Sequence, residues 1–196
     1  MQVSAILLAA GQSRRMGRLK QLLPLGGKPV MSHCLDAIIH AGIRDIVVVI
    51  NPRMNEMAKA LRRVPATVVF NDEPSSEMAE SVRIGLKSLV ASSSGVLIYL
   101  SDHPLVSADT VKCLIAGHET EPDKILIPVF ENKRGHPCLF PRYCADEVFH
   151  GSTLREIVHK DNGRIRLVEV RDGGTLFDMD TEKDYDTMLR HVSFKS

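Results

Sequence analysis

Basic side chains and glycines gather directly behind the first apolar run of this 196-residue chain, in the stretch AAGQSRRMGRLKQLLPLGGKP. Glycine and other small residues let backbone N–H groups approach an anion closely. Arginine makes bidentate contacts to phosphate and lysine supplies a point charge, and the stretch offers Arg14, Arg15, Arg18 and Lys20. It therefore predicts a polyphosphate site, with a flexible loop of solvated charges as the alternative. Neither G-x-G-x-x-G nor G-x-x-x-x-G-K-[ST] is present, so the dinucleotide and Walker loops are excluded.

Carboxylates form the second candidate group. Asp102 follows the apolar run GVLIYL, and the late segment LFDMDTEKDY carries Asp178, Asp180 and Asp184. Oxygen ligands of this type suit Mg²⁺, which binds one or two carboxylates together with substrate phosphates. Helix caps and solvated surface carboxylates are the alternative for this late group.

The elements that must position these groups alternate along the chain. Five short apolar runs recur, and most of them lack polar alternation, which is typical of strands covered on both faces. They are Val3–Ala9, Ile46–Ile50, Ala66–Phe70, Gly95–Leu100 and Ile125–Phe130. Helical spacing follows in VMSHCLDAIIHAG, with Gly42 as its stop, and in MAESVRIGLKSLV. The alternation predicts an α/β fold with a mostly parallel sheet, whose ligands bind beyond the carboxyl ends of the strands.

After Phe130 the regular alternation weakens. ENKRGHPCLFPRY is rich in glycine, proline and charge, and it is followed by a helical CADEVF, a helix over 152–161 and a last strand, IRLVEV. No linker, internal repeat or low-complexity tract separates this part from the rest. We therefore expect a single domain over residues 1–196 with an elaborated C-terminal half.

Composition excludes several classes of protein. Lys plus Arg is 25 against 24 for Asp plus Glu, so no global field favours nucleic acid or an anionic membrane, and we expect neither as a partner. The N-terminal MQVSAILLAAG has no basic leader, and its apolar run is too short to span a bilayer. The four cysteines show no C-x-x-C pair and no zinc spacing, which predicts reduced, mostly structural thiols. A cytoplasmic protein is the expectation.

The opening stretch resembles the nucleotidyltransferase signature L-x-A-G-x-x-x-R-M-G, followed by a lysine and then G-x-[KQ]-P. The resemblance is to the MobA-like NTP transferases, and in particular to the molybdenum-cofactor branch with its cytidylyltransferases (MocA-like) and guanylyltransferases. It continues through SVRIGL, SDHPLV, GHPCLF and DMDTEKDY, in the family's order and over nearly the full length.

The resemblance implies a Rossmann-like nucleotidyltransferase sandwich with helices on both faces of the central sheet. The nucleotide-binding residues that it implies are Leu8, Ala9, Ala10, Gly11, Arg15, Lys20, Asn71 and Ser81. Arg15, Lys20 and Asp102 are the implied catalytic residues, with Lys20 on the α-phosphate and Lys28 as a second basic position. Because charge and not packing motivates Lys20, its loss is expected to lower turnover with little effect on the melting temperature. Ser81 has a competing interpretation as a helix-surface serine.

The implied metal pair is Asp102 and Asp180, holding Mg²⁺. Ser101 stands where the family has glycine, Glu182 where it has proline and Lys183 where it has an acid. A cap for the last helix is the alternative role for Asp180.

The implied acceptor-binding residues are Gly135, His136 and Pro137, in the N-terminal part of RGHPCLF. A charged histidine or arginine there is expected to meet an acceptor phosphate, with a structural or solvated histidine as the alternative. Ala10 favours CTP over GTP, since cytidylyl members tend to have alanine at this position. The implied partners are a nucleoside triphosphate, a small phosphorylated acceptor such as molybdopterin, and a molybdoenzyme or its chaperone.

Two other functions stay open at the level of sequence. One is nucleotidyl transfer to a sugar or polyol phosphate. The other is a non-catalytic cofactor-binding chaperone on the same fold. Loss of the lysine or of a metal aspartate would favour the chaperone, and Lys20, Asp102 and Asp180 are all present.

Overall fold

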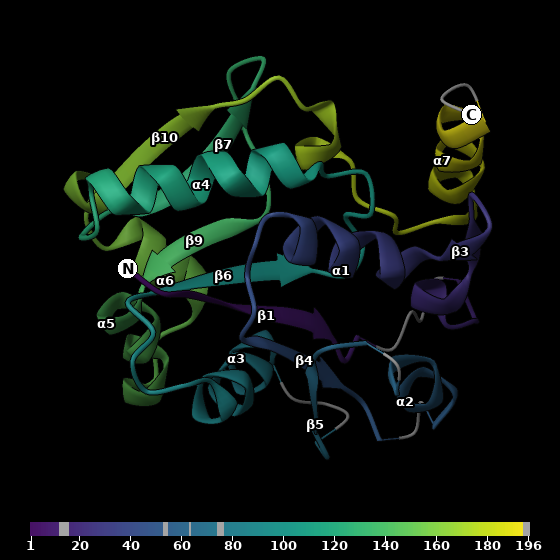
Figure 1. Cartoon of the computed structure of the whole chain (residues 1–196), viewed down its shortest axis with the longest axis horizontal. Helices are drawn as coiled ribbons and strands as arrows, with labels where there is room; N and C mark the ends of the chain where they lie inside the picture. The colour runs from purple at the N-terminus through teal and green to yellow at the C-terminus, as the bar shows by residue number, and fades with distance from the viewer. Residues whose placement is uncertain (12–15, 53–54, 63, 74–76, 194–196) are drawn as a thin grey trace.

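The computed structural model describes residues 1–11, 16–52, 55–62, 64–73 and 77–193. Its centre is a sheet in the order β10-β7-β9-β6-β1-β4-β5, with β8 paired to β7 (Figure 1). The strands are β1 (Val3–Ala9), β4 (Ile46–Ile50), β5 (Thr67–Phe70), β6 (Gly95–Leu100), β7 (Ile125–Phe130), β8 (Lys133–Arg134), β9 (Cys138–Pro141) and β10 (Ile165–Glu169). β1 pairs in parallel with β4 and β6, β4 with β5, and β7 with β10, so the predicted mostly parallel sheet is confirmed.

Helices cover both faces of the sheet because neighbouring strand residues point to opposite sides. In β1, Ala5 and Leu7 face a core shared with α1 (Val30–His40), α2 (Asn55–Leu61) and α4 (Ala108–Thr120). Ile6 and Leu8 face a second core shared with α3 (Met78–Ser88), α5 (Arg142–Ala145) and α6 (Leu154–His159). Gly42 follows α1 with a φ of 94°, which favours glycine as its stop.

The C-terminal half departs from the prediction in one respect. The segment expected to be irregular contains β9, whose four residues are buried and which runs antiparallel between β6 and β7. It was missed because four residues flanked by proline show no usable periodicity. The predicted helix over 152–161 is the shorter α6, capped at Thr153, and CADEVF is shared between α5 and the 3₁₀ turn η2 (Asp146–His150).

A third, smaller core lies beyond the carboxyl ends of the strands. It joins the hairpin β2 (Pro24–Leu25) and β3 (Lys28–Pro29) to the last helix, α7 (Glu182–Ser193), through buried Leu25, Met179, Tyr185 and Met188. In Figure 1 α7 stands at the right-hand edge beside β3. Within the described ranges, no helix is both long and apolar enough to cross a membrane.

Candidate active site

Lys20 lies at the centre of the site, in the 3₁₀ turn η1 (Lys20–Leu22). Its ammonium Nζ donates to Asp102 Oδ2 at 3.0 Å, to Asp180 Oδ1 at 2.9 Å and to the Met179 carbonyl at 2.8 Å. The lysine is 9% exposed. The structure thus brings together three of the residues predicted from sequence, although they lie up to 160 positions apart.

The electrostatics of this cluster favour a charged lysine. Burial lowers the pKa of Lys20, but the two carboxylates of Asp102 and Asp180 outweigh it, and the net pKa is raised. At neutral pH Lys20 is therefore an ammonium ion held between two carboxylates. Such a buried cation stays only where its partners compensate the lost hydration.

Two chain segments position the carboxylates. Asp102 follows β6, and its carbonyl accepts the amide of Met179 at 2.9 Å, so the segment carrying Asp180 is tied to the loop after β6. Met179 is fully buried in the third core. The Tyr185 hydroxyl donates to the Pro24 carbonyl and fastens α7 to the hairpin next to η1. Packing of the last helix is therefore what places Asp180 opposite Asp102.

Asp180 does not cap α7, which corrects the alternative considered above. Thr181 and Asp184 form that cap: the Asp184 carboxylate accepts the amides of Asp180 and Thr181, and Thr181 Oγ1 accepts the amide of Asp184. Asp178 is exposed, as expected of a surface carboxylate.

Other basic residues of the opening stretch have different positions. Arg18 is exposed and forms a two-pronged ion pair with Glu182, the residue that stands in place of the family's proline. Lys28 pairs with Asp36 of α1. The predicted residue Arg15, like Arg14, lies outside the described residues.

The residues predicted to bind nucleotide lie along the same edge of the sheet. Leu8 and Ala9 are buried at the end of β1, and Gly11 is exposed at the start of the loop. Asn71 follows β5, and its Nδ2 donates to Ser81 Oγ at 2.9 Å. Ser81 is 6% exposed in the first turn of α3, so its interpretation as a surface serine is wrong. The carboxyl-end edge of the sheet thus carries a buried polar pair, Asn71 and Ser81.

The predicted acceptor residues lie on the other side of Asp102. The His136 amide donates to the Thr175 carbonyl at 2.9 Å, and a Cβ on Gly135 would meet the same oxygen at 2.6 Å. Glycine is therefore required where this loop passes the 3₁₀ turn η4 (Gly173–Leu176). Pro137 is buried directly before β9.

Sequence reasoning missed one residue of this region, His103. It is 5% exposed, and its ring centroid lies 5.2 Å from that of His136. Its Nε2 is 3.8 Å from Asp102 Oδ1. Its place next to Asp102 in SDHPLV is the signal that could have found it.

The two imidazoles are neutral at pH 7. Burial and, to a smaller extent, the neighbouring His103 lower the pKa of His136 to about 4, and burial also lowers the pKa of His103. The expectation of a charged His136 is therefore wrong for this structure. A neutral ring offers an acceptor one hydrogen-bond donor and one acceptor nitrogen.

This shift predicts acid sensitivity. In the unfolded state His136 binds a proton near the ordinary imidazole pKa of 6.5, and in the folded state it does so only near 4. Stability therefore falls as the pH drops through this window, since the unfolded state binds more protons there. We expect the His136→Gln variant to lose less of its melting temperature than wild type between pH 7 and pH 5. The exposed His150→Gln serves as control, and parallel curves for all three proteins would contradict the prediction.

The donor set fits a divalent cation. Asp102 Oδ1 is buried and has no hydrogen-bond partner among the described residues, and Asp102 Oδ2 and Asp180 Oδ1 both lie within 3.0 Å of one atom, Lys20 Nζ. Hard carboxylate oxygens are the ligands that Mg²⁺ and Mn²⁺ prefer. No group of three metal-ligating side chains occurs in the described part of the chain, so phosphates and water would supply the other ligands.

Comparison with known proteins assigns the family. Residues 5–168 match the model of the MobA-like NTP transferase domain. The chain belongs to this family. The predicted Rossmann-like fold is confirmed with it: this MobA-like chain superimposes on Rv0371c from Mycobacterium tuberculosis with a TM-score of 0.85 at 27% identity, covering 97% of this chain and 98% of that one.

Further relatives define how far the assignment reaches. A manganese complex of Rv0371c has a TM-score of 0.79 at 25% identity, with 97% and 99% of the two chains covered. The nicotine blue oxidoreductase of Paenarthrobacter nicotinovorans is 26% identical over 191 residues, 91% of this chain and 92% of that protein. The bifunctional protein GlmU of Clostridium tetani is 29% identical over 86% of this chain, which spans only 34% of that protein. This MobA-like chain is thus a nucleotidyltransferase by family, and its acceptor is not named by these relatives.

Proposed function

We propose that the protein transfers a nucleotidyl group, CMP from CTP, to a molybdopterin or molybdenum cofactor and releases pyrophosphate. The observation that carries this proposal is the clamp of Lys20 between Asp102 and Asp180, at the sheet edge where the nucleotide loop ends. Molybdopterin is proposed from the resemblance of the GHP segment to that branch. Mg²⁺ is the proposed cation, and it would neutralise charge on the triphosphate when bound at Asp102 and Asp180.

The proposed reaction has a simple balance. An oxygen of the acceptor phosphate attacks the α-phosphorus of CTP, a new P–O bond forms, and the bond to the β-phosphate breaks to release pyrophosphate. Negative charge builds on the nonbridging oxygens, so catalysis depends on positioning and on charge neutralisation. Lys20 is the buried cation of the site, and we assign it to the α-phosphate once nucleotide is bound.

The remaining residues bind and orient. The backbone of 8–11 and the Asn71–Ser81 pair would hold base, ribose and phosphates on one side of Asp102. Gly135, His136 and Pro137, joined by His103, would face the acceptor on the other side. The neutral imidazoles favour an acceptor that exchanges hydrogen bonds over one held by an imidazolium charge.

Pyrophosphate release tests the proposal. CTP with molybdopterin should release pyrophosphate in the presence of Mg²⁺, whereas CTP alone should not. Release only with sugar or polyol phosphates would move the protein to the alternative acceptor class. Binding without turnover of any acceptor would favour the chaperone, although the intact lysine and aspartates argue against it.

Nucleotide choice gives a separate prediction. Ala10 is partly buried directly after β1, and the resemblance associates alanine at this position with cytidylyl transfer. We expect CTP to outcompete GTP in wild type and the Ala10→Gly variant to narrow the difference. Competition between the two nucleotides in one assay measures it. A preference of wild type for GTP would remove the basis of the assignment to CTP.

A further inference from the structure

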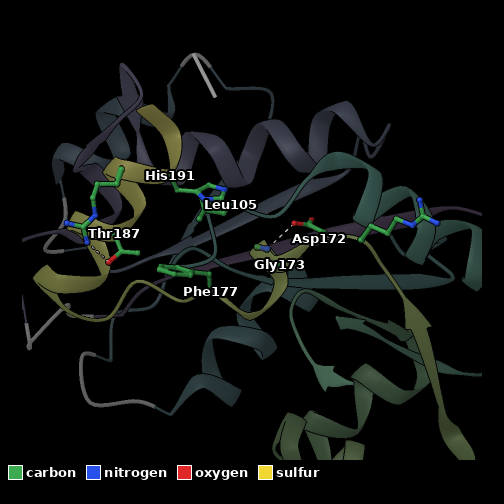
Figure 2. A pocket seen from close by; sticks show the side chains of 9 residues that line it. Leu105, Asp172, Gly173, Phe177, Thr187 and His191 are labelled. Atoms are coloured by element: carbon green, nitrogen blue, oxygen red, sulfur yellow. Dashed lines mark hydrogen bonds between the residues drawn. The ribbon is translucent and has the colours of Figure 1, made fainter. Parts of the chain in front are cut away.

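A cavity is lined by residues of the two segments that carry Asp102 and Asp180, together with residues of η4 and α7. It has a volume of about 580 Å³, and we call it the rear pocket. It is lined by Leu105, Arg171, Asp172, Gly173, Gly174, Phe177, Thr187, Arg190 and His191. Figure 2 shows the side chains of Leu105, Phe177 and His191 around it.

The rear pocket is separate from the predicted nucleotide site. Its wall belongs to η4, α7 and the loop after β6, whereas Asn71 and Ser81 lie by α3, on the opposite face of the sheet from α1 and α4. Leu105 and Phe177 are partly buried and pack against the third core, so they supply an apolar floor. The volume is within the range of small-molecule sites.

The rim of the rear pocket carries two arginines and a histidine. Arg171, Arg190 and His191 are all exposed. Within the described residues Arg171 and His191 have no hydrogen-bond or ion-pair partner, and the Arg190 guanidinium donates only to Thr187 Oγ1, at 3.1 Å. These groups therefore have free donors for a ligand.

The one acid in the wall does not cancel this charge through an ion pair. Asp172 Oδ2 accepts the Ser107 amide, the Ser107 hydroxyl and the Thr110 hydroxyl, and Oδ1 accepts the Gly174 amide, the bond dashed in Figure 2. Its carboxylate is thus occupied in fixing η4 to the start of α4. An apolar floor under free cations is complementary to an organic anion.

We propose that the rear pocket binds a small organic anion, with an apolar body on Leu105 and Phe177 and a phosphate or carboxylate on the rim. A ligand bound there changes the metal affinity of the carboxylate pair, Asp102 and Asp180. Leu105 lies in the same loop as Asp102, and Phe177 lies in the same segment as Asp180. The Met179 amide joins these two segments, so a ligand that immobilises both from behind also fixes the spacing of the carboxylates.

Calorimetry with defined probes tests binding without relying on the proposed reaction. We expect phenyl phosphate or benzoate to bind saturably at one site and the neutral benzyl alcohol to bind far more weakly. The stronger of the two anions identifies the headgroup as phosphate or carboxylate. Saturating CTP should not displace the probe, because the two sites are separate; displacement by CTP would overturn the proposal, as would no saturable binding of either anion.

Variants locate the probe. The double variant Arg171→Gln/Arg190→Gln should weaken binding by about tenfold or more, as expected for the loss of charge-assisted hydrogen bonds. Thr187→Trp should block the pocket by volume without changing its charge. The matched control Arg44→Gln/Arg155→Gln removes two exposed arginines elsewhere and should bind as wild type. Equal affinity in all four proteins would place the probe outside the rear pocket.

Mn²⁺ binding tests the coupling. Titration of Mn²⁺ with and without the probe should give different dissociation constants, and Mn²⁺ should change the affinity for the probe by the same factor, because coupling between two sites is reciprocal. The Thr187→Trp variant should lose this dependence. Identical Mn²⁺ affinities in the presence and absence of bound probe would overturn the action on the carboxylate pair.

Discussion

The Lys20→Met variant is expected to turn over about 10²–10³-fold more slowly than wild type and yet to bind Mn²⁺ more tightly when nucleotide is absent. The slower turnover follows from the loss of the buried cation assigned to the α-phosphate. The tighter metal binding follows from the geometry, since Lys20 Nζ lies 3.0 Å and 2.9 Å from the two carboxylate oxygens that would hold the metal. Lys20 and the metal ion therefore compete for the same two carboxylates.

The melting temperature provides a second measurement. Removing one partner of a buried ion pair leaves the other charge uncompensated. Asp102 and Asp180 would then repel each other in metal-free buffer, so the variant should melt at a lower temperature and recover when Mn²⁺ is added. The melting temperature of the wild type should rise less on addition of Mn²⁺ than that of the variant.

Lys28→Met is the matched control, because Lys28 pairs with Asp36 and not with the metal pair. It should leave Mn²⁺ affinity unchanged. An unaltered kcat in Lys20→Met would remove Lys20 from catalysis. A normal rate loss with unaltered Mn²⁺ affinity would show that the lysine and the metal use different oxygens.

The stability effect of Lys20 is a point at which sequence and structure differ. In the sequence Lys20 belongs to a glycine-rich loop, and nothing near it indicates a partner, so its loss was expected to leave stability almost unchanged. The structure buries it against Asp102, Met179 and Asp180. Such partners come from segments far away along the chain, and only the packing of α7 brings them together.

The sheet itself was largely predictable. Strands such as Ile46–Ile50 are buried along their whole length and leave an unbroken apolar run in the sequence. β9 leaves no such signal. α4 received no prediction, because ADTVKCLIAGHET interrupts its helix formers with threonine, valine, isoleucine and glycine. Tertiary contacts and the N-terminal cap by Ser107 stabilise this helix.

Of the candidate site, the sequence predicted Lys20, Asp102 and Asp180, which the structure brings together, but not their pairing with one another. The sequence motif GHP suggested a charged histidine. The pKa of His136 is lowered by its buried surroundings, including His103, and these are visible only in the structure. Ser81 could not be distinguished from a surface serine until Asn71 was placed beside it.

The last prediction concerns the two carboxylates, Asp102 and Asp180. Asp102→Asn and Asp180→Asn should each lose most of the turnover, by about 10²-fold or more, because an amide oxygen is a weaker ligand for a hard cation and carries no charge. Both substitutions keep the shape of the side chain, so packing around Met179 should persist. The exposed Asp178→Asn, in the same segment, should retain wild-type turnover.

The double variant separates a shared metal from two independent contributions. If Asp102 and Asp180 hold one ion, removal of either ligand already disables it, so the double variant should lose little more than the worse single variant. Independent roles would instead multiply the two losses. The Mg²⁺ concentration that gives half-maximal turnover should be higher in each single variant than in the wild type, and it should be unchanged in Asp178→Asn. Near-wild-type turnover of Asp180→Asn at ordinary Mg²⁺ would leave Asp180 as a structural partner of Lys20 and would end the shared-metal model.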